Sequence, residues 1–255
     1  MSQEITVRHC RGLEEIDNCV ELQRRVWGER DLEIVPNTVF IVALQVGGQV
    51  LGAFEGREMV GFTFAMPGVR DGKPYLHSHM TALLEPYRDR GVGQRLKLFQ
   101  REDALAHGIG LVEWTFDPLA TRNAHFNLDR LGAIVRRGIR NAYGVTSSPM
   151  HRGLPTDRLV AEWLLESPRV REVLDGRVPK RQGEIAEIVV PENIEDRTTF
   201  SITDVAAVQE RVMTEFEGWF ARGYTAVSGA RSPEGFKYIL DSKPFGLSEP
   251  PGVKA

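Results

Sequence analysis

The feature that most constrains the fold of this chain is a two-glycine turn between an expected strand and an expected helix. The strand is expected over Tyr75–Leu84 and the helix from about Gly93 to His107, and the turn between them runs Glu85-Pro86-Tyr87-Arg88-Asp89-Arg90-Gly91-Val92. The first N–H groups of a helix have no partner within it and carry partial positive charge, and glycine lets that backbone approach a ligand closely. The turn is therefore predicted to bind an anion such as a pyrophosphate, with Arg88, Arg90 and Arg95 adding positive charge. The alternative is that both glycines serve only the geometry of the turn.

Two other glycine-rich phosphate-binding motifs are excluded by the same stretch of sequence. No Gly-x-Gly-x-x-Gly follows the strand, and no Gly-Lys-Ser or Gly-Lys-Thr occurs there. A dinucleotide-binding turn and a P-loop are therefore not expected.

The first two thirds of the chain alternate between strand and helix patterns. Apolar residues at alternating or helical spacing, separated by glycine-containing turns, predict the following elements. Strands are expected at Ile5 and Val7, over Gln49–Phe54, Met59–Met66 and Leu111–Phe116, from Ala133 to Val135, and over Leu159–Leu165; helices are expected over Leu13–Trp27 and Asn123–Leu131. Thr38–Val46 fits a helix or a strand, and Asp71-Gly72 marks a hairpin.

The last third has a different organisation. Residues 167–184 are rich in charge and turn formers and are expected to be a connector, followed by a strand Ile185–Val190, a helix Asp204–Arg222 and strands Tyr224–Ser228 and Phe236–Leu240. Residues 246–255 are expected to be a flexible tail. The mixture of strands and helices predicts an α+β fold, with one sheet continued or flanked by this segment.

Composition narrows the class of protein and of partner. The 255 residues are 42% hydrophobic and 26% charged, with a formal net charge of −3, which argues against binding through neutralised nucleic-acid phosphates. No apolar run approaches the span of a bilayer, and the sequence begins without the features of a signal peptide. Cys10 and Cys19 form no CxxC pair. A soluble cytoplasmic protein without nucleic-acid or membrane partners is expected.

The glycine turn and its surroundings resemble those of a known superfamily. Arg88-x-x-Gly91-x-Gly93 followed by Gln94-Arg95-Leu96, the next strand Leu111–Phe116, and Asn123-Ala124-x-Phe126 ending in Leu131-Gly132 are similar to the acyl-CoA-binding motifs of the Gcn5-related N-acetyltransferases (GNATs). The resemblance covers roughly Ile5 to Leu165. It implies a GNAT-like acyl-CoA-binding domain over 1–166, with 185–245 as an appended α/β segment.

The resemblance also implies how the coenzyme is held. Acetyl-CoA or another acyl-CoA would lie where the sheet splays between the strands Tyr75–Leu84 and Leu111–Phe116. Its pantetheine arm would pair with backbone at Leu83 and Leu84 and contact Asn123. Its pyrophosphate would accept hydrogen bonds from the amides of Arg88, Asp89, Arg90, Gly91, Val92, Gly93 and Gln94. A backbone amide of the splayed strand would stabilise the oxyanion of the tetrahedral intermediate.

One departure from the family pattern concerns the general acid. Many members have a tyrosine where this chain has Leu128, and the usual Gly-Phe is Gly132-Ala133. A thiol is already a tolerable leaving group near neutral pH, so Tyr143 or water is an alternative donor. The departure favours a relative that binds CoA without catalysis.

The candidate general bases lie on the strand before the turn and on the next strand. His77 and His79 are two residues apart and therefore face the same side, with the ordinary pKa suited to accepting a proton. The pair resembles the proton relay of arylalkylamine acetyltransferases within the superfamily. Glu113 is an alternative base, although an exposed strand glutamate is the simpler interpretation. His-x-His also suits a metal, but no third ligand is placed by spacing, and no metal is expected.

Two groups of basic residues are candidates for gripping the 3′-phosphate of CoA or an acidic acceptor. They are Arg136, Arg137 and Arg140, and then Arg169, Arg171, Arg177, Lys180 and Arg181. Solvated surface charge is the favoured interpretation of both.

The sequence thus predicts an N-acyltransferase that transfers an acetyl or succinyl group to the amine of a small molecule or amino acid, by direct attack in a ternary complex. The competing hypotheses are a CoA-binding regulatory or interaction module, and a purely structural glycine turn with function in the last third. The acceptor, the acyl group and the choice between monomer and homodimer stay open.

Overall fold

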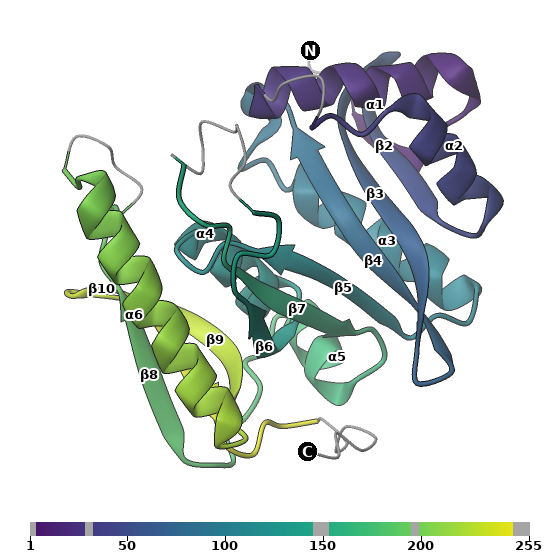
Figure 1. Ribbon diagram of the computed structural model, residues 1–255. Coiled ribbons are helices and arrows are strands. Elements are labelled where there is room, and N and C mark those ends of the chain that lie inside the picture. Colours follow the sequence, from purple (N-terminus) through teal and green to yellow (C-terminus); the bar gives the residue numbers. More distant parts are fainter. Residues whose placement is uncertain (1–3, 29–32, 145–152, 195–198, 247–255) are drawn as a thin grey trace. The chain divides into compact units, whose positions relative to one another are not determined.

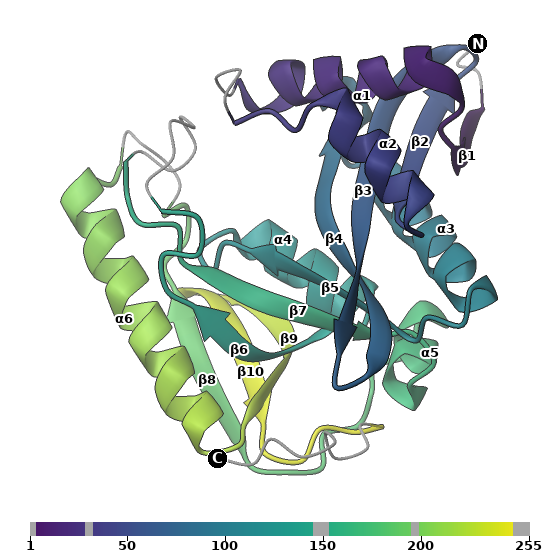
Figure 2. The same ribbon diagram turned by 45° about the vertical axis from the view of Figure 1, so that its right-hand side comes forward.

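The structure is a computed structural model that describes residues 4–28, 33–144, 153–194 and 199–246 (Figures 1 and 2). The chain forms two compact units. The first comprises Met1–Trp114 with Val145–Gly153, and the second comprises Thr115–Gly144 with Leu154–Ala255. Each is described by itself. The domain limits expected from the sequence fall at other positions and remain a prediction.

The first unit is a sheet in the order β1-β2-β3-β4-β5 with helices on both faces. Its elements are β1 (Ile5–His9), α1 (Gly12–Trp27), α2 (Asn37–Gln45), β2 (Gln49–Glu55), β3 (Glu58–Arg70), β4 (Lys73–Leu83), the short helix η1 (Glu85–Tyr87), α3 (Val92–Ala106) and β5 (Leu111–Phe116). β1 to β4 are antiparallel neighbours, joined at Gly56 and at Asp71-Gly72 by the left-handed turns that the sequence predicts.

The helices of the first unit cover opposite faces of its sheet, with α1 and α2 on one face and α3 on the other (Figure 2). Two clusters of apolar side chains hold them there. On one face α1 and α2 contribute Ile16, Cys19 and Phe40, which pack with Phe62 and Phe64. On the other face α3 contributes Val92 and Leu96, packed against alternate residues of β2 and β3. The α1/α2 face and the α3 face are therefore the two opposite sides of the sheet to which residues of β4 can point.

The pairing of β4 with β5 is short. In the described residues it is parallel and consists of Leu76 opposite Val112 and His77 opposite Glu113. β4 continues beyond His77 to Leu83 along β3 alone. This departure of β4 from β5 fits the splayed sheet that the GNAT resemblance implies.

The second unit is an antiparallel sheet in the order β7-β6-β9-β10-β8. Its elements are α4 (Thr121–His125), the π-helical turn η2 (Phe126–Arg130), β6 (Ile134–Ile139), β7 (Arg158–Leu164), α5 (Pro168–Leu174), β8 (Ile185–Val190), α6 (Ile202–Ala221), β9 (Thr225–Ser232) and β10 (Gly235–Asp241). The appended strand–helix–strand segment adds β9 to β6, with Ala226 opposite Val135. Trp163 and Tyr238 are fully buried and donate to the carbonyls of Leu131 and Pro118 at 2.7 Å each.

Most expected elements are confirmed, including the α+β class. Of the two alternatives for Thr38–Val46 the helix is confirmed, since α2 runs to Gln45 and Val46 is its C-cap. Two expectations need correction. The single helix expected over Asn123–Leu131 is α4 followed by η2. The stretch 167–184 contains α5, which begins because Ser167 accepts a hydrogen bond from the Val170 amide and Pro168 occupies the first turn. The expected flexible tail lies almost wholly outside the described residues. In the part of the chain that the structure describes, no helix has the length and apolar character needed to cross a membrane.

Candidate acyl-CoA site

The glycine turn presents the start of α3 without a capping side chain. Gly91 is the N-cap residue, in the left-handed region with φ 76° and ψ 0°, and no side chain of the described residues caps the helix. The first helical bond, from the Arg95 amide to the Gly91 carbonyl, is 3.0 Å long. The amides of Val92, Gly93 and Gln94 thus precede the first internal hydrogen bond, and the helix dipole concentrates partial positive charge there.

The two glycines of the turn have different physical roles. Gly91 requires the left-handed backbone, which a residue with a Cβ adopts only at a cost. Gly93 has no positive φ, and a Cβ there would meet only Leu83 Cδ1 at 3.4 Å, an ordinary contact. The fold therefore needs glycine at position 91 and tolerates a side chain at position 93.

The three arginines around the turn have separate partners. Arg88 is exposed and its Nε donates to the Leu83 carbonyl at 3.3 Å. Arg90 is exposed and lies 5.1 Å from the centre of the Tyr87 ring. Arg95 is exposed in the first turn of α3 and donates to the Ile5 carbonyl of β1. All three arginines keep their positive charge near the turn, and their contact with an anion stays a prediction.

The backbone at the end of β4 is partly engaged. The Leu84 amide donates to the Val60 carbonyl at 3.0 Å, and the Leu84 carbonyl accepts from the Tyr87 amide at 3.0 Å. The Leu83 carbonyl accepts from Arg88. A pantetheine arm that pairs at Leu83 would share its carbonyl with Arg88, and the Leu84 amide is available only if its bond to β3 breaks.

A β-bulge in β4 lies at the candidate base. Phe64 is opposite Met80 and Ala65 is opposite Ser78, so His79 has no partner residue on β3. Before the bulge, Ser78 points to the α3 face, where its hydroxyl accepts from Lys97. After it, Met80 packs on the α1/α2 cluster. The bulge therefore changes which residues of β4 face each side, as such irregularities do next to active sites.

His77 and His79 lie side by side, as their spacing predicts. Their ring centres are 6.2 Å apart, and His79 also meets the Phe64 ring edge-on at 6.1 Å. Burial lowers the pKa of His79 below its ordinary value, and the neighbouring His77 lowers it further. His79 is therefore held in the neutral form that accepts a proton.

Glu113 is buried, so the simpler interpretation of an exposed strand glutamate is wrong. It is 1% exposed and lies opposite His77 in the β4–β5 pairing. Both carboxylate oxygens are engaged by Arg70, with Nη2 to Oε2 at 2.6 Å and Nη1 to Oε1. Arg70 therefore occupies both oxygens of a buried carboxylate, which leaves the histidines as the side chains better placed to meet a substrate amine.

Lys97 is a functional candidate in this region that the sequence pattern does not single out, because a lysine in an amphipathic helix is ordinarily exposed. It is 4% exposed and donates to Ser78 Oγ at 2.8 Å and to Gln100 Oε1 at 3.0 Å. Its Nζ lies 4.1 Å from the centre of the Trp114 ring. Lys97 thus contacts β4 and β5 immediately past their last paired residues. Its spacing with buried Gln100 and Ala104 along one helix face is the signal that could have identified it.

The remaining candidates belong to the second unit. Asn123 is exposed on α4. Tyr143 is 49% exposed and its hydroxyl lies 2.8 Å from the Thr115 hydroxyl of β5. Leu128, at the position of the family's tyrosine, is fully buried in η2. The buried Leu128 cannot donate a proton, whereas the half-exposed Tyr143 hydroxyl is accessible to a ligand.

The expected solvation of the basic residues is confirmed for Arg171, Arg177, Lys180 and Arg181, which are exposed, and is wrong for Arg169, which is buried. The three arginines of the first group are half-buried and paired. Arg136 donates to Glu162 with Nε at 2.9 Å, Arg137 lies 4.0 Å from Glu162, and Arg140 pairs with two glutamates of α6. Arg169 is 5% exposed. In the described part of the chain, no three histidine, cysteine or acidic side chains are grouped so as to hold a metal ion.

Comparison with known proteins identifies the fold. No protein-family model matches the sequence, and no curated protein matches it. Among solved structures, an Acinetobacter baylyi putative acetyltransferase has a TM-score of 0.52 at 15% identity, over 66% of this chain and 95% of its own. YncA, a putative acetyltransferase from Salmonella typhimurium with acetyl-CoA, has a TM-score of 0.51 at 15% identity, over 64% of this chain and 94% of its own. A putative GNAT-family acetyltransferase from Desulfovibrio desulfuricans has a TM-score of 0.51 at 14% identity, over 64% of this chain and 99% of its own. About two thirds of the chain therefore has a fold similar to the GNAT fold, as the sequence predicts.

Proposed function

Because the chain has the GNAT fold, we propose that it is an acyl-CoA-dependent N-acyltransferase that acts in the cytoplasm on the amine of a small molecule or amino acid. The observation that carries the proposal is the uncapped start of α3, where Gly91 leaves the amides of Val92, Gly93 and Gln94 open to a pyrophosphate. Arg88 and Arg90 would add charge at its edge. Acetyl-CoA or succinyl-CoA would serve as co-substrate, with Asn123 contacting the pantetheine arm.

In the proposed reaction the amine attacks the thioester carbonyl directly. An ammonium substrate first loses its proton to His79, either directly or through water, and His77 passes the proton towards solvent. The carbonyl oxygen becomes an oxyanion, which a backbone amide at the β4 bulge would stabilise. The C–S bond then breaks, the former amine nitrogen releases its second proton to water, and the CoA thiolate takes up a proton from water or Tyr143. The Arg70–Glu113 ion pair would hold β5 in place opposite His77.

The buried Leu128 favours a second candidate, a GNAT-fold module that binds CoA without catalysis. Leu128 stands where many members of the family have the tyrosine that donates a proton to the leaving thiolate. CoA binding without turnover by any donor would identify this second function.

The first experiment tests the coenzyme site with Gly93→Asp. An acidic residue in the first turn of a helix is compatible with its dipole, so the variant should keep its fold. Its carboxylate would repel a diphosphate, and we expect CoA affinity to fall by roughly tenfold to a hundredfold because charge opposes charge at short range. Isothermal titration of both proteins with CoA measures the difference.

Gly110→Asp is the matched control, because Gly110 is exposed, has open space around it and belongs to the same unit. It should bind CoA as the wild type does. Equal CoA affinity of the wild type and both variants would contradict a pyrophosphate site at the start of α3. Mass-detected transfer from acetyl-CoA and succinyl-CoA to a panel of amines then separates the enzyme from the binding module.

A further inference from the structure

The second unit contains a cavity that the proposed reaction does not use. It measures about 90 Å³ and lies among η2, α5, β9 and residues 177–181. Four basic residues line it: Arg169, Arg177, Lys180 and Arg181. The sequence grouped these residues as a basic run, and the fold gathers them around one space.

Arg169 is the buried member of this group. Its Nη2 donates to the carbonyls of Leu128, at 3.3 Å, and Val227. Its Nε is buried and has no hydrogen-bond partner among the described residues. Burial lowers the pKa of Arg169 to about 10, so the guanidinium remains charged at neutral pH. A buried cationic donor without an acceptor is costly unless a ligand or water supplies one.

The two carboxylates on the cavity wall are already engaged elsewhere. Asp129 accepts from the Ser228 hydroxyl at 2.6 Å and from the Gly229 amide at 3.1 Å. Asp241 accepts from the amides of Gly183 at 2.9 Å and Lys243 at 2.7 Å. Neither forms an ion pair with Arg169 in the described part of the chain. Arg177 pairs with Asp175 at 2.8 Å. Three basic side chains, Arg169, Lys180 and Arg181, therefore stand against these two carboxylates, which leaves an excess of one positive charge on the cavity wall.

The rest of the wall is apolar, and the cavity is small. Leu128, Val173, Val178, Val227 and Phe245 contribute hydrocarbon surface. A volume of about 90 Å³ suits an acid group with a short hydrocarbon part and excludes a whole coenzyme A.

We propose that this cavity binds a small organic oxyanion, with its acid group on the Arg169 guanidinium and its hydrocarbon part on the valines. Carboxylate and phosphate groups share the planar or tetrahedral oxygens that an arginine fork recognises. Lys180 and Arg181 close the basic side of the site. The site lies wholly in the second unit, so it stands or fails independently of the coenzyme site.

The test uses three probes: sodium isovalerate, inorganic phosphate and the neutral isovaleramide. In ¹H–¹⁵N spectra of the full chain, the Arg169 Nε–H resonance should shift on titration with an oxyanion and stay unchanged with the amide. Saturation by isovalerate identifies a carboxylate ligand, and saturation by phosphate alone identifies a phosphate ester; either supports the proposal. No saturable shift with either oxyanion overturns it.

Variants separate a binding site from a structural arginine. Arg169→Lys keeps the charge but loses the fork, and Lys180→Gln with Arg181→Gln leaves Arg169 intact; each should weaken probe binding by roughly tenfold. Arg231→Gln, at an exposed arginine outside the cavity lining, is the control and should bind normally. Gly93→Asp should also bind the probes normally. This variant removes phosphate binding at the glycine turn, so unchanged binding shows that the probes bind elsewhere. Unchanged binding in the Lys180/Arg181 variant and in Arg169→Lys, with the fold checked by circular dichroism, overturns the proposal.

Discussion

At the scale of single residues, Lys97 shows how costly an interior charge is in this protein. Its partners are a hydroxyl, an amide oxygen and an aromatic face, and burial lowers its pKa from 10.5 to about 7. No carboxylate offsets the desolvation of its ammonium group among the described residues. Below about pH 7 the folded protein must therefore bury a charged amine.

We expect Lys97→Met to stabilise the protein at about pH 6 by about 1–3 kcal/mol, net of two lost hydrogen bonds. Between pH 7 and 10.5 the unfolded chain binds a proton that folded wild type does not, so wild-type stability rises with pH in this window. The gain in stability from the substitution should therefore be smaller at about pH 9.5 than at about pH 6. Urea unfolding of both proteins at these two pH values measures the difference in the free energy of unfolding. The exposed Lys73→Met is the control, and a gain independent of pH would contradict the assignment.

The two histidines of β4 give a second prediction at this scale. Because His77 contributes to the lowered pKa of His79, His77→Gln should raise the pKa of His79 towards 6.5. A proton titration of the His79 ring by NMR measures this directly. If His79 is the base, the acid limb of kcat/KM should move to higher pH in the same variant, since the base must be neutral to act. An unmoved acid limb with a shifted ring pKa would assign the base elsewhere.

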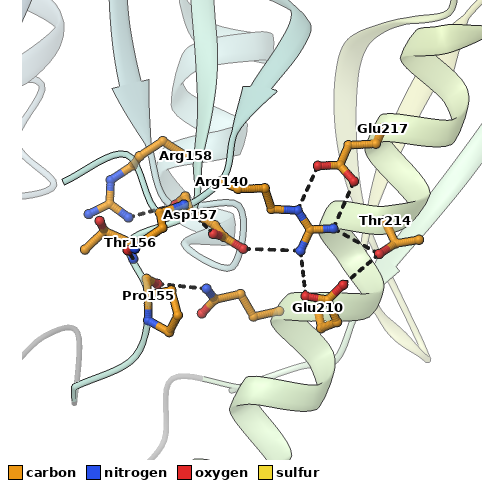
Figure 3. A network of polar contacts seen from close by, with 10 residues as sticks. Arg140, Pro155, Thr156, Asp157, Arg158, Glu210, Thr214 and Glu217 are labelled. Carbon is orange, nitrogen blue, oxygen red and sulfur yellow. Dashed lines mark hydrogen bonds and ion pairs between the residues drawn. The ribbon is translucent and has the colours of Figure 1, made fainter. Parts of the chain in front are cut away.

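At the scale of elements, Arg140 connects the long helix of the second unit to its sheet (Figure 3). It follows β6 and donates to Glu217 at 2.7 and 2.9 Å and to Glu210 at 2.7 Å, both on α6. Asp157, just before β7, lies 3.7 Å away. The hydrogen bond from Arg140 lowers the pKa of Glu217, so the network stabilises the ionised form of that carboxyl.

Arg140→Met should lower the free energy of unfolding at pH 7 by about 1 kcal/mol. The loss is modest because solvent screens the pairs: the side chain of Arg140 is 33% exposed, that of Glu217 49% and that of Glu210 71%. The Glu217 contribution is present above its ordinary pKa of 4.5 and is lost as the pH falls through its lowered value. The difference between the proteins should therefore narrow below about pH 4.5. Denaturant unfolding at pH 7 and at about pH 3.5 tests this, with Arg231→Met as the control. A constant difference would mean that packing of the side chain, not its charge, holds α6.

Elements differed in how well the sequence predicted them. Hairpins were predicted well because Gly56 and Asp71-Gly72 adopt backbone angles that few other residues accept. The break between α4 and η2 was not predicted, because a π-helical turn depends on the hydrogen-bond donors that its carbonyls contact in the folded protein. The η2 carbonyl of Leu128 accepts from Arg169, 41 residues away.

At the scale of the whole molecule, ligand binding couples to stability by mass action. CoA at a hundred times its Kd should stabilise the folded protein by about 2.7 kcal/mol. For a chain of this size we expect a rise in Tm of roughly 5–10 °C. Differential scanning calorimetry with and without CoA measures it. Gly93→Asp should show little rise at the same CoA concentration, and an equal rise in that variant would place the coenzyme elsewhere.

The sequence by itself determined the local features of this protein. Alternation placed His77 and His79 on one side of a strand, and the two glycines marked the start of α3. The tertiary structure alone decided which charges are buried and what they touch. Glu113 meets Arg70 from 43 residues away, and Gln49 reaches Asp103 from 54 residues away. The reason is physical: backbone angles depend on neighbouring residues, whereas the cost of burying a charge depends on partners that only folding brings together.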